Sequence, residues 1–91
     1  MSCEVRVPAP LRSLTGGRGS VEVGGSTVRS VLREIEKRHA GLLDRICESG
    51  GELRSYVNIY VNDSDIRSLK GLDTEVGEGD TVFIVPAIAG G

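Results

Sequence analysis

The sequence offers few side chains of the kinds that catalyse reactions or bind metal ions. It has one histidine, His39, and two cysteines, Cys3 and Cys47, which lie far apart in the chain. A zinc site needs several such ligands at close spacing, and a catalytic nucleophile needs a base beside it. We therefore predict neither a metal site nor a catalytic centre, with Cys3 in the core, Cys47 partly exposed and His39 at a helix end.

Two glycine-rich segments remain as candidates for chemistry. Gly16-Gly17-Arg18-Gly19 resembles a phosphate-binding loop only in composition, because it lacks the Lys-Ser/Thr pair and the strand-to-helix context. A flexible hairpin loop is the prediction for that segment. The other is the chain end, residues 86–91, which reads Pro86, Ala87, Ile88, Ala89, Gly90 and Gly91. Proline ends strand pairing and the glycines have no side chains to pack, so an extended mobile tail is predicted after a domain of residues 1–85.

The hydrophobic pattern predicts the elements that hold this tail. Apolar and polar residues alternate over 3–7, 20–23 and 56–62, which predicts strands, and the mostly apolar run 81–85 is the predicted last strand. Apolar residues at helical spacing predict a helix over 27–39, with Ser26 or Thr27 as its N-cap. A short helical turn is expected at 42–46, and a brief strand at Ile66-Arg67.

This order of elements predicts an α+β domain. One amphipathic helix is expected to lie across the apolar face of a mixed sheet of four or five strands. In the last strand Val82 and Ile84 would face the helix, so Phe83 and Val85 must point to the opposite face. On that face Tyr60 is their polar neighbour. The pair is either an interface or a cover over the sheet.

Composition limits the function further. At 91 residues the chain is one small domain with little room for a water-free reaction chamber, and at a net charge of −2 it has no general attraction for nucleic acid. Residues 1–47 hold eight basic and five acidic side chains, and residues 48–91 hold three basic and eight acidic. Since no leader or membrane-spanning stretch is evident, a cytoplasmic protein is expected.

Several motifs resemble one family throughout the chain. They are Thr-Val-x-x-Val-Leu (27–32), Arg-His-x-Gly-Leu (38–42), Asn-Ile-Tyr-Val-Asn (58–62), Gly-Leu-Asp-Thr (71–74), the run 77–87 and the final Ala-Gly-Gly. In this order they resemble the ubiquitin-like sulfur carrier proteins of the MoaD and ThiS family, most closely its CysO-type carriers. The resemblance implies a β-grasp fold.

The resemblance also implies a chemistry centred on Gly91. In this family the terminal carboxylate is adenylated by an ATP-dependent enzyme of the MoeB or ThiF type, related to ubiquitin-activating enzymes, and then becomes a thiocarboxylate. The carrier itself holds no cofactor, is not an enzyme, and hands its sulfur to a biosynthetic enzyme. Residues 86–91 would span about 20 Å when extended, enough to enter a partner's active site.

The folded body of the carrier, residues 1–85, must then dock on the partner enzyme. Ordering six tail residues costs about 6–12 kcal/mol of backbone entropy, which contacts elsewhere must offset. Phe83, Val85 and Tyr60 are the predicted docking residues, because an exposed aromatic side chain near a working terminus is a suitable anchor.

The residues leave two questions open, the pathway that accepts the sulfur and an alternative function. The sulfur acceptor pathway is cysteine first, then a thiolated secondary metabolite such as a thiosugar, with molybdopterin and the thiamin thiazole also compatible with the family. The alternative function is a ubiquitin-like modifier joined to target lysines through Gly91. With only Lys37 and Lys70 beside nine arginines, the chain has few sites for building polymers on itself, which favours the carrier.

Overall fold

Alternating strands and helices build the domain in the predicted order. The structure is a computed structural model that describes residues 2–86. Its strands are β1 (Ser2–Arg6), β2 (Ser20–Gly24), β3 (Val57–Val61), β4 (Ser64–Asp65) and β5 (Thr81–Pro86). The helices are α1 (Val28–Arg38) and α2 (Leu42–Ile46), with 3-10 turns η1 (Ala9–Thr15), η2 (Ile66–Ser68) and η3 (Gly71–Asp73).

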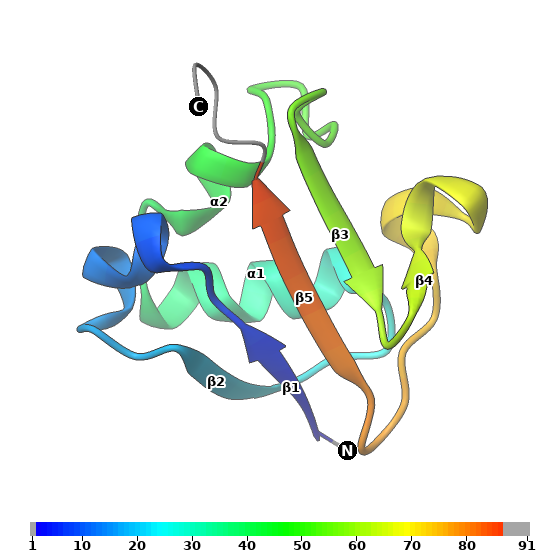
Figure 1. The fold of residues 1–91 in the computed structure, drawn as a ribbon, viewed down its shortest axis with the longest axis horizontal. Coiled ribbons are helices and arrows are strands. Elements are labelled where there is room, and N and C mark those ends of the chain that lie inside the picture. The colour runs from blue at the N-terminus through cyan, green and yellow to red at the C-terminus, as the bar shows by residue number, and fades with distance from the viewer. Residues whose placement is uncertain (1, 87–91) are drawn as a thin grey trace.

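The five strands form one mixed sheet in the order β2-β1-β5-β3-β4. β1 and β5 pair in parallel, and every other neighbouring pair is antiparallel. The last strand therefore lies in the middle of the sheet, between the first strand and β3, and α1 crosses one face (Figure 1). This arrangement confirms the predicted α+β, β-grasp fold with one main helix on the sheet.

Helix α1 forms where its sequence supplies both a cap and an apolar stripe. The Thr27 hydroxyl accepts a hydrogen bond from the Ser30 backbone N–H, and the Ser30 hydroxyl accepts one from the Thr27 N–H, each satisfying a donor that the helix start leaves free. Gly25, just before the helix, has φ 154°, and a Cβ atom there would lie 2.7 Å from Val31 Cγ2. Only glycine fits that close approach.

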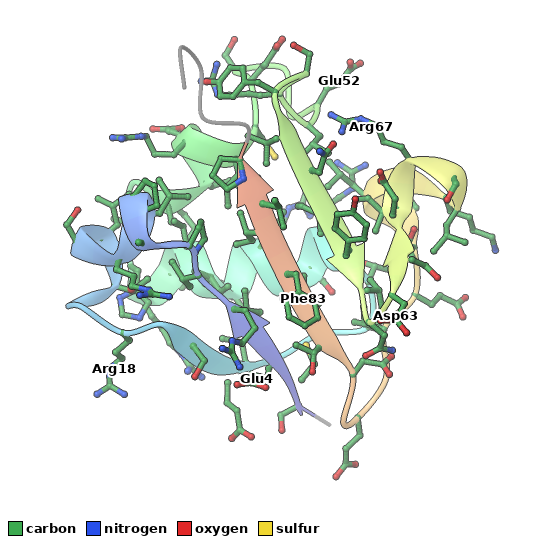
Figure 2. All side chains as sticks on the ribbon, viewed as in Figure 1. Glu4, Arg18, Glu52, Asp63, Arg67 and Phe83 are labelled. Atoms are coloured by element: carbon green, nitrogen blue, oxygen red, sulfur yellow. The ribbon has the colours of Figure 1, made fainter. Side chains whose placement is uncertain are left out.

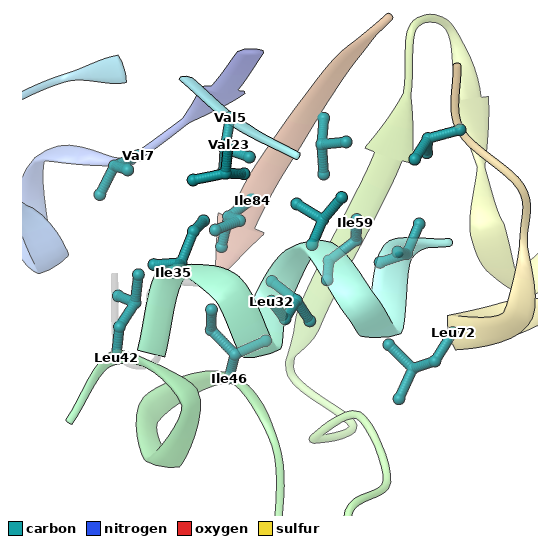
Figure 3. Close-up of a cluster of buried hydrophobic side chains, with 14 of the residues drawn as sticks. Val5, Val7, Val23, Leu32, Ile35, Leu42, Ile46, Ile59, Leu72 and Ile84 are labelled. Atoms are coloured by element: carbon teal, nitrogen blue, oxygen red, sulfur yellow. The ribbon is translucent and has the colours of Figure 1, made fainter. Parts of the chain in front are cut away.

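The core lies between α1 and the sheet (Figure 3). It is a single cluster in which every strand except β4 contributes alternate residues and α1 contributes one stripe. The four helix residues are Val28, Val31, Leu32 and Ile35. The fully buried Ile59 and Val82 face them, as predicted, which fixes the opposite surface as the outer face of the sheet.

Two predictions about local structure were wrong, and one element was not predicted. Ile66-Arg67 is not a strand: β4 is Ser64–Asp65, and 66–68 is a 3-10 turn because the Asp65 carboxylate accepts the Arg67 backbone N–H and Ile66 is fully buried. Cys47 is buried rather than partly exposed, because it follows α2 on the core side. The η1 turn after β1 was not predicted at all.

Pro86 also differs from its predicted place. It is the last residue of β5, opposite Val57, rather than the first residue of a tail. Pairing between β5 and β1 ends at Phe83, so at Pro86 the neighbouring strand is β3 alone. The missing N–H of Pro86 therefore breaks no hydrogen bond to β1. Residues 87–91 lie outside the described part of the chain.

Candidate functional site

Strand β5 presents its residues to two faces and leads to the C-terminus of the chain. Val82 and Ile84 are buried under α1, whereas Phe83 and Val85 are 36% and 43% exposed on the outer face. This confirms the alternation predicted from the sequence. Because β5 is the middle strand, Phe83 lies at the centre of the outer face with a paired strand on both sides, whereas Val85 lies past the end of β1 and pairs with β3 alone.

Phe83 lies in a row that crosses three strands. Arg6 of β1 is its partner on one side, and Tyr60 of β3 is its partner on the other. Directly opposite residues of an antiparallel pair, such as Phe83 and Tyr60, have their Cβ atoms about 4.5–5.5 Å apart, and the register places Arg6 on the other side of Phe83. The register thus brings the predicted docking residues Phe83, Val85 and Tyr60 together on one surface, and Figure 2 shows Phe83 near its middle.

Val85 has a different setting, closer to the end of β5. Its partner on β3 is Asn58, and the Arg67 guanidinium donates hydrogen bonds to Asn58 Oδ1 and to the Arg54 carbonyl oxygen. Arg67 therefore reaches from η2 to Asn58, on the outer side of β3. The sequence gives no signal that joins Arg67 to Asn58, because their contact depends on how the chain turns between β3 and η2.

The Asp80 carboxylate, just before β5, holds the start of that strand in place through hydrogen bonds. Asp80 accepts hydrogen bonds from the Gly77 backbone N–H at 2.8 Å and from Asn62 Nδ2 at 3.1 Å, and the Asn62 Oδ1 accepts the Thr81 N–H. These hydrogen bonds hold the pKa of Asp80 below its usual value, despite a small opposing effect of burial. The start of β5 is therefore fixed to the end of β3.

Comparison with known proteins agrees with this geometry. The model of the ThiS family matches residues 5–91, a range that includes the terminal glycines. The chain belongs to the ThiS family. The sulfur carrier protein CysO of Mycobacterium tuberculosis is 43% identical over 93 residues, covering the whole of both chains. Small archaeal modifier protein 3 of Haloferax volcanii is 34% identical, again over both full chains.

Solved structures of ThiS-like proteins share the fold closely. A chain in the Amycolatopsis orientalis BexX/CysO complex is 45% identical with a TM-score of 0.92, covering 98% of this chain and 99% of that one. Mycobacterium tuberculosis CysO, described as an antigen, has a TM-score of 0.90 at 41% identity, with coverage of 94% and 99%. The resemblance to the ubiquitin-like sulfur carriers is therefore confirmed.

The remaining candidate residues of this ThiS-family chain lie away from the outer face. Cys3 and Cys47 are buried in the core, and burial raises the pKa of both thiols, with Asp80 adding to the effect at Cys3. His39 caps the end of α1 as expected, and its N–H donates to the Ile35 carbonyl oxygen. The Gly16-Gly19 segment is the connection between η1 and β2.

The centre of the expected chemistry is Gly91. It lies outside the described residues, as do Ala87, Ile88, Ala89 and Gly90, so the role of the chain end stays a prediction from the sequence and the family. No helix among residues 2–86 has the length and apolar character needed to cross a membrane.

Proposed function

We propose that this chain is a sulfur carrier, in which the carboxylate of Gly91 is activated with ATP and converted to a thiocarboxylate that donates sulfur in biosynthesis. The observation that carries the proposal is the ThiS-family match, which runs to Gly91, together with 43% identity to a CysO sulfur carrier over both full chains. The chain acts as a substrate of partner enzymes and catalyses no step itself.

The chemistry has two steps. A Gly91 carboxylate oxygen attacks the α-phosphorus of ATP, the bond to the β-phosphate oxygen breaks, and pyrophosphate leaves. Hydrosulfide then attacks the acyl carbon, the bond to the AMP oxygen breaks, and loss of the sulfur-bound proton leaves the thiocarboxylate. The first step is needed because a carboxylate is a poor electrophile, whereas AMP is a good leaving group.

The partner enzyme supplies ATP binding and catalysis, and the carrier supplies a fixed body. Phe83 and Val85 are the proposed anchors, with Tyr60 beside them. All three lie on the rigid centre of a five-stranded sheet, so their positions relative to the end of β5 do not have to be ordered when the body docks. Binding energy from the body is then available to order residues 87–91.

Mass spectrometry of the intact protein tests this function. The chain is incubated with ATP, the adenylating enzyme from the organism that encodes it, and a sulfide source. Replacement of one terminal oxygen by sulfur is the expected result. An unchanged mass, under conditions in which a CysO carrier is loaded by its own enzyme, would contradict the proposal.

For the sulfur acceptor, we propose an enzyme that makes cysteine, in line with the similarity to CysO proteins. A chain loaded with isotopically labelled sulfur should transfer the label to a free amino-acid product in extracts of its organism. Label that appears instead in a thiosugar or another secondary metabolite would identify that pathway.

A second candidate function is protein modification. It is favoured by the 34% identity to small archaeal modifier protein 3 of Haloferax volcanii over both full chains. Both functions begin with adenylation of Gly91, so the difference lies in what attacks the acyl carbon. An isopeptide bond between Gly91 and a lysine of another protein, found after digestion, would demonstrate this second function.

A further inference from the structure

The outer face of the sheet carries its charges in a definite order along the strands. The charged residues that point outward from β1, β2, β3 and β5 are Glu4, Arg6 and Glu22. Glu4 is level with Thr81, where β5 begins, and Arg6 is level with Phe83, nearer the end of β5. Two residues of strand separate these opposite charges.

Carboxylates are paired with each other at the start of β5. Glu4 and Glu22 are direct partners in the β1–β2 register, and both point outward because Cys3, Val5, Val21 and Val23 are buried. Like charges directly opposite on a sheet destabilise it. The Arg6 guanidinium lies 3.7 Å from Glu4 and both side chains are well exposed, so this ion pair offsets little of the repulsion.

A fixed guanidinium lies toward the other end. Arg67 donates to two neutral acceptors, Asn58 Oδ1 and the Arg54 carbonyl oxygen, and it is exposed. Among residues 2–86, no carboxylate lies within ion-pair distance of its guanidinium. A guanidinium has five N–H donors, so Arg67 keeps donors for a ligand in a position already fixed by the fold.

The apolar anchors lie between these charges. Figure 2 shows Glu4 toward the start of β5, Phe83 near the middle and Arg67 toward the end where the chain continues to Gly91. Glu52, also labelled at that end, belongs to the loop between α2 and β3 rather than to the sheet face. Asp65 of β4 lies opposite Tyr60, at the edge of the sheet. Apart from this carboxylate, the outer face runs from negative, through apolar, to positive in the direction of the C-terminus.

We propose that this charge order sets the orientation in which the body docks on the adenylating enzyme. Arg6 and Arg67 bind carboxylates beside the cleft that receives the chain end, and Glu4 with Glu22 bind a cationic group farther from it. The inference rests on the proposed function, and it names the residues that would determine specificity in the adenylation step. Phe83 and Val85 would fit a docking reversed by 180° equally well, but the charges would not.

A charge swap on β1 tests the orientation without changing the net charge. In the double variant Glu4→Arg with Arg6→Glu, the two side chains exchange places, so that a guanidinium instead of a carboxylate stands opposite Glu22. We expect a Tm equal to or above that of the wild type. We also expect kcat/KM for ATP-dependent adenylation to fall by about 5- to 20-fold at low salt, mainly through KM.

The matched control is the swap Arg33→Glu with Glu34→Arg. These adjacent residues lie on α1, which covers the other face of the sheet, and their exchange also preserves the net charge. This control should keep the wild-type kcat/KM. Arg67→Gln should raise KM several-fold with kcat retained, and added salt should shrink its difference from the wild type.

The outcomes separate the inference from the function on which it rests. A wild-type chain that is adenylated, with a β1 swap variant of unchanged kcat/KM, overturns the inference and leaves the function intact. Equal losses in the β1 and α1 swaps overturn it as well. A wild-type chain that is neither bound by the adenylating enzyme nor adenylated overturns both.

Discussion

Phe83 combines a backbone fixed by strand pairing with an exposed side chain. Its backbone is held by pairing on both sides, with Arg6 and Tyr60 as neighbours, while its side chain is 36% exposed. Removal of the ring therefore leaves the sheet intact but takes apolar area from the outer face. We therefore expect a change at Phe83 to affect docking more than stability.

We predict that Phe83→Ala weakens docking on the adenylating enzyme by about 1–3 kcal/mol, which is typical of an aromatic anchor. The dependence of the adenylation rate on carrier concentration measures this effect, and an unfolding curve measures stability. Leu69→Ala is the matched control, because Leu69 is 49% exposed but lies beyond η2, away from the sheet face. Unchanged kinetics for Phe83→Ala would show that the ring only covers the sheet.

Glu36 illustrates how one residue joins two elements. Its carboxylate oxygens accept the backbone N–H groups of Gly41 at 3.0 Å and Leu43 at 2.9 Å, so α2 begins against the end of α1. The charge of the carboxylate strengthens both hydrogen bonds, which lower the pKa of Glu36 more than burial raises it. A depressed pKa means that the contribution to stability is present at neutral pH and lost on acidification.

Glu36→Gln should lower the Tm at pH 7, because the amide has one acceptor oxygen and no charge. The difference from the wild type should shrink as the pH falls below the ordinary glutamate pKa of about 4.3 and through the lower folded-state value. Thermal unfolding at several pH values measures this. Glu34→Gln, three residues from Lys37 on an exposed ion pair, is the control. A gap that stays constant with pH would contradict the role assigned to the charge.

Buried and exposed positions of the β3–β5 pair are expected to contribute differently to stability. Ile59 is fully buried under α1, so Ile59→Ala should destabilise the domain by about 2–4 kcal/mol through lost burial and a cavity. Val85→Ala, on the outer face, should cost much less. Denaturant midpoints of the two variants measure the difference, and a reversed order would mean that the faces are assigned the wrong way round.

The residues that stabilise the fold and the residue proposed to react lie in different parts of the chain. All residues of the buried core lie between Cys3 and Ile84, whereas the proposed reaction takes place at Gly91. A carrier that serves more than one enzyme benefits from this division, because each partner brings its own catalytic groups and the carrier needs only a docking face and a terminal carboxylate.

We expect deletion of Gly91, or addition of one residue after it, to abolish thiocarboxylate formation without lowering the Tm. The terminal carboxylate is displaced along the chain in both variants, while the core is unchanged. Intact-mass spectrometry and thermal unfolding measure the two properties on the same samples. Sulfur loading of the deletion variant would remove Gly91 from the mechanism.

The fold class, the buried face of each main strand and the extent of α1 could be predicted from residue types alone. These follow from periodicity within one element, such as the stripe from Val28 to Ile35 and the alternation from Val82 to Val85, which local backbone geometry converts directly into faces. The motifs throughout the chain also indicated the family, which the match to the ThiS model confirms, and the role of Gly91 is a prediction from that family.

Only the tertiary structure decided which residues surround the docking face. Arg6 lies beside Phe83 because the first and last strands pair in parallel, and Arg67 reaches Asn58 because 66–68 turns instead of continuing as a strand. Cys47 became a core residue for a similar reason, the packing of α2. Such contacts join residues that are distant in the chain, or depend on how a turn closes, and no local pattern of residue types specifies them.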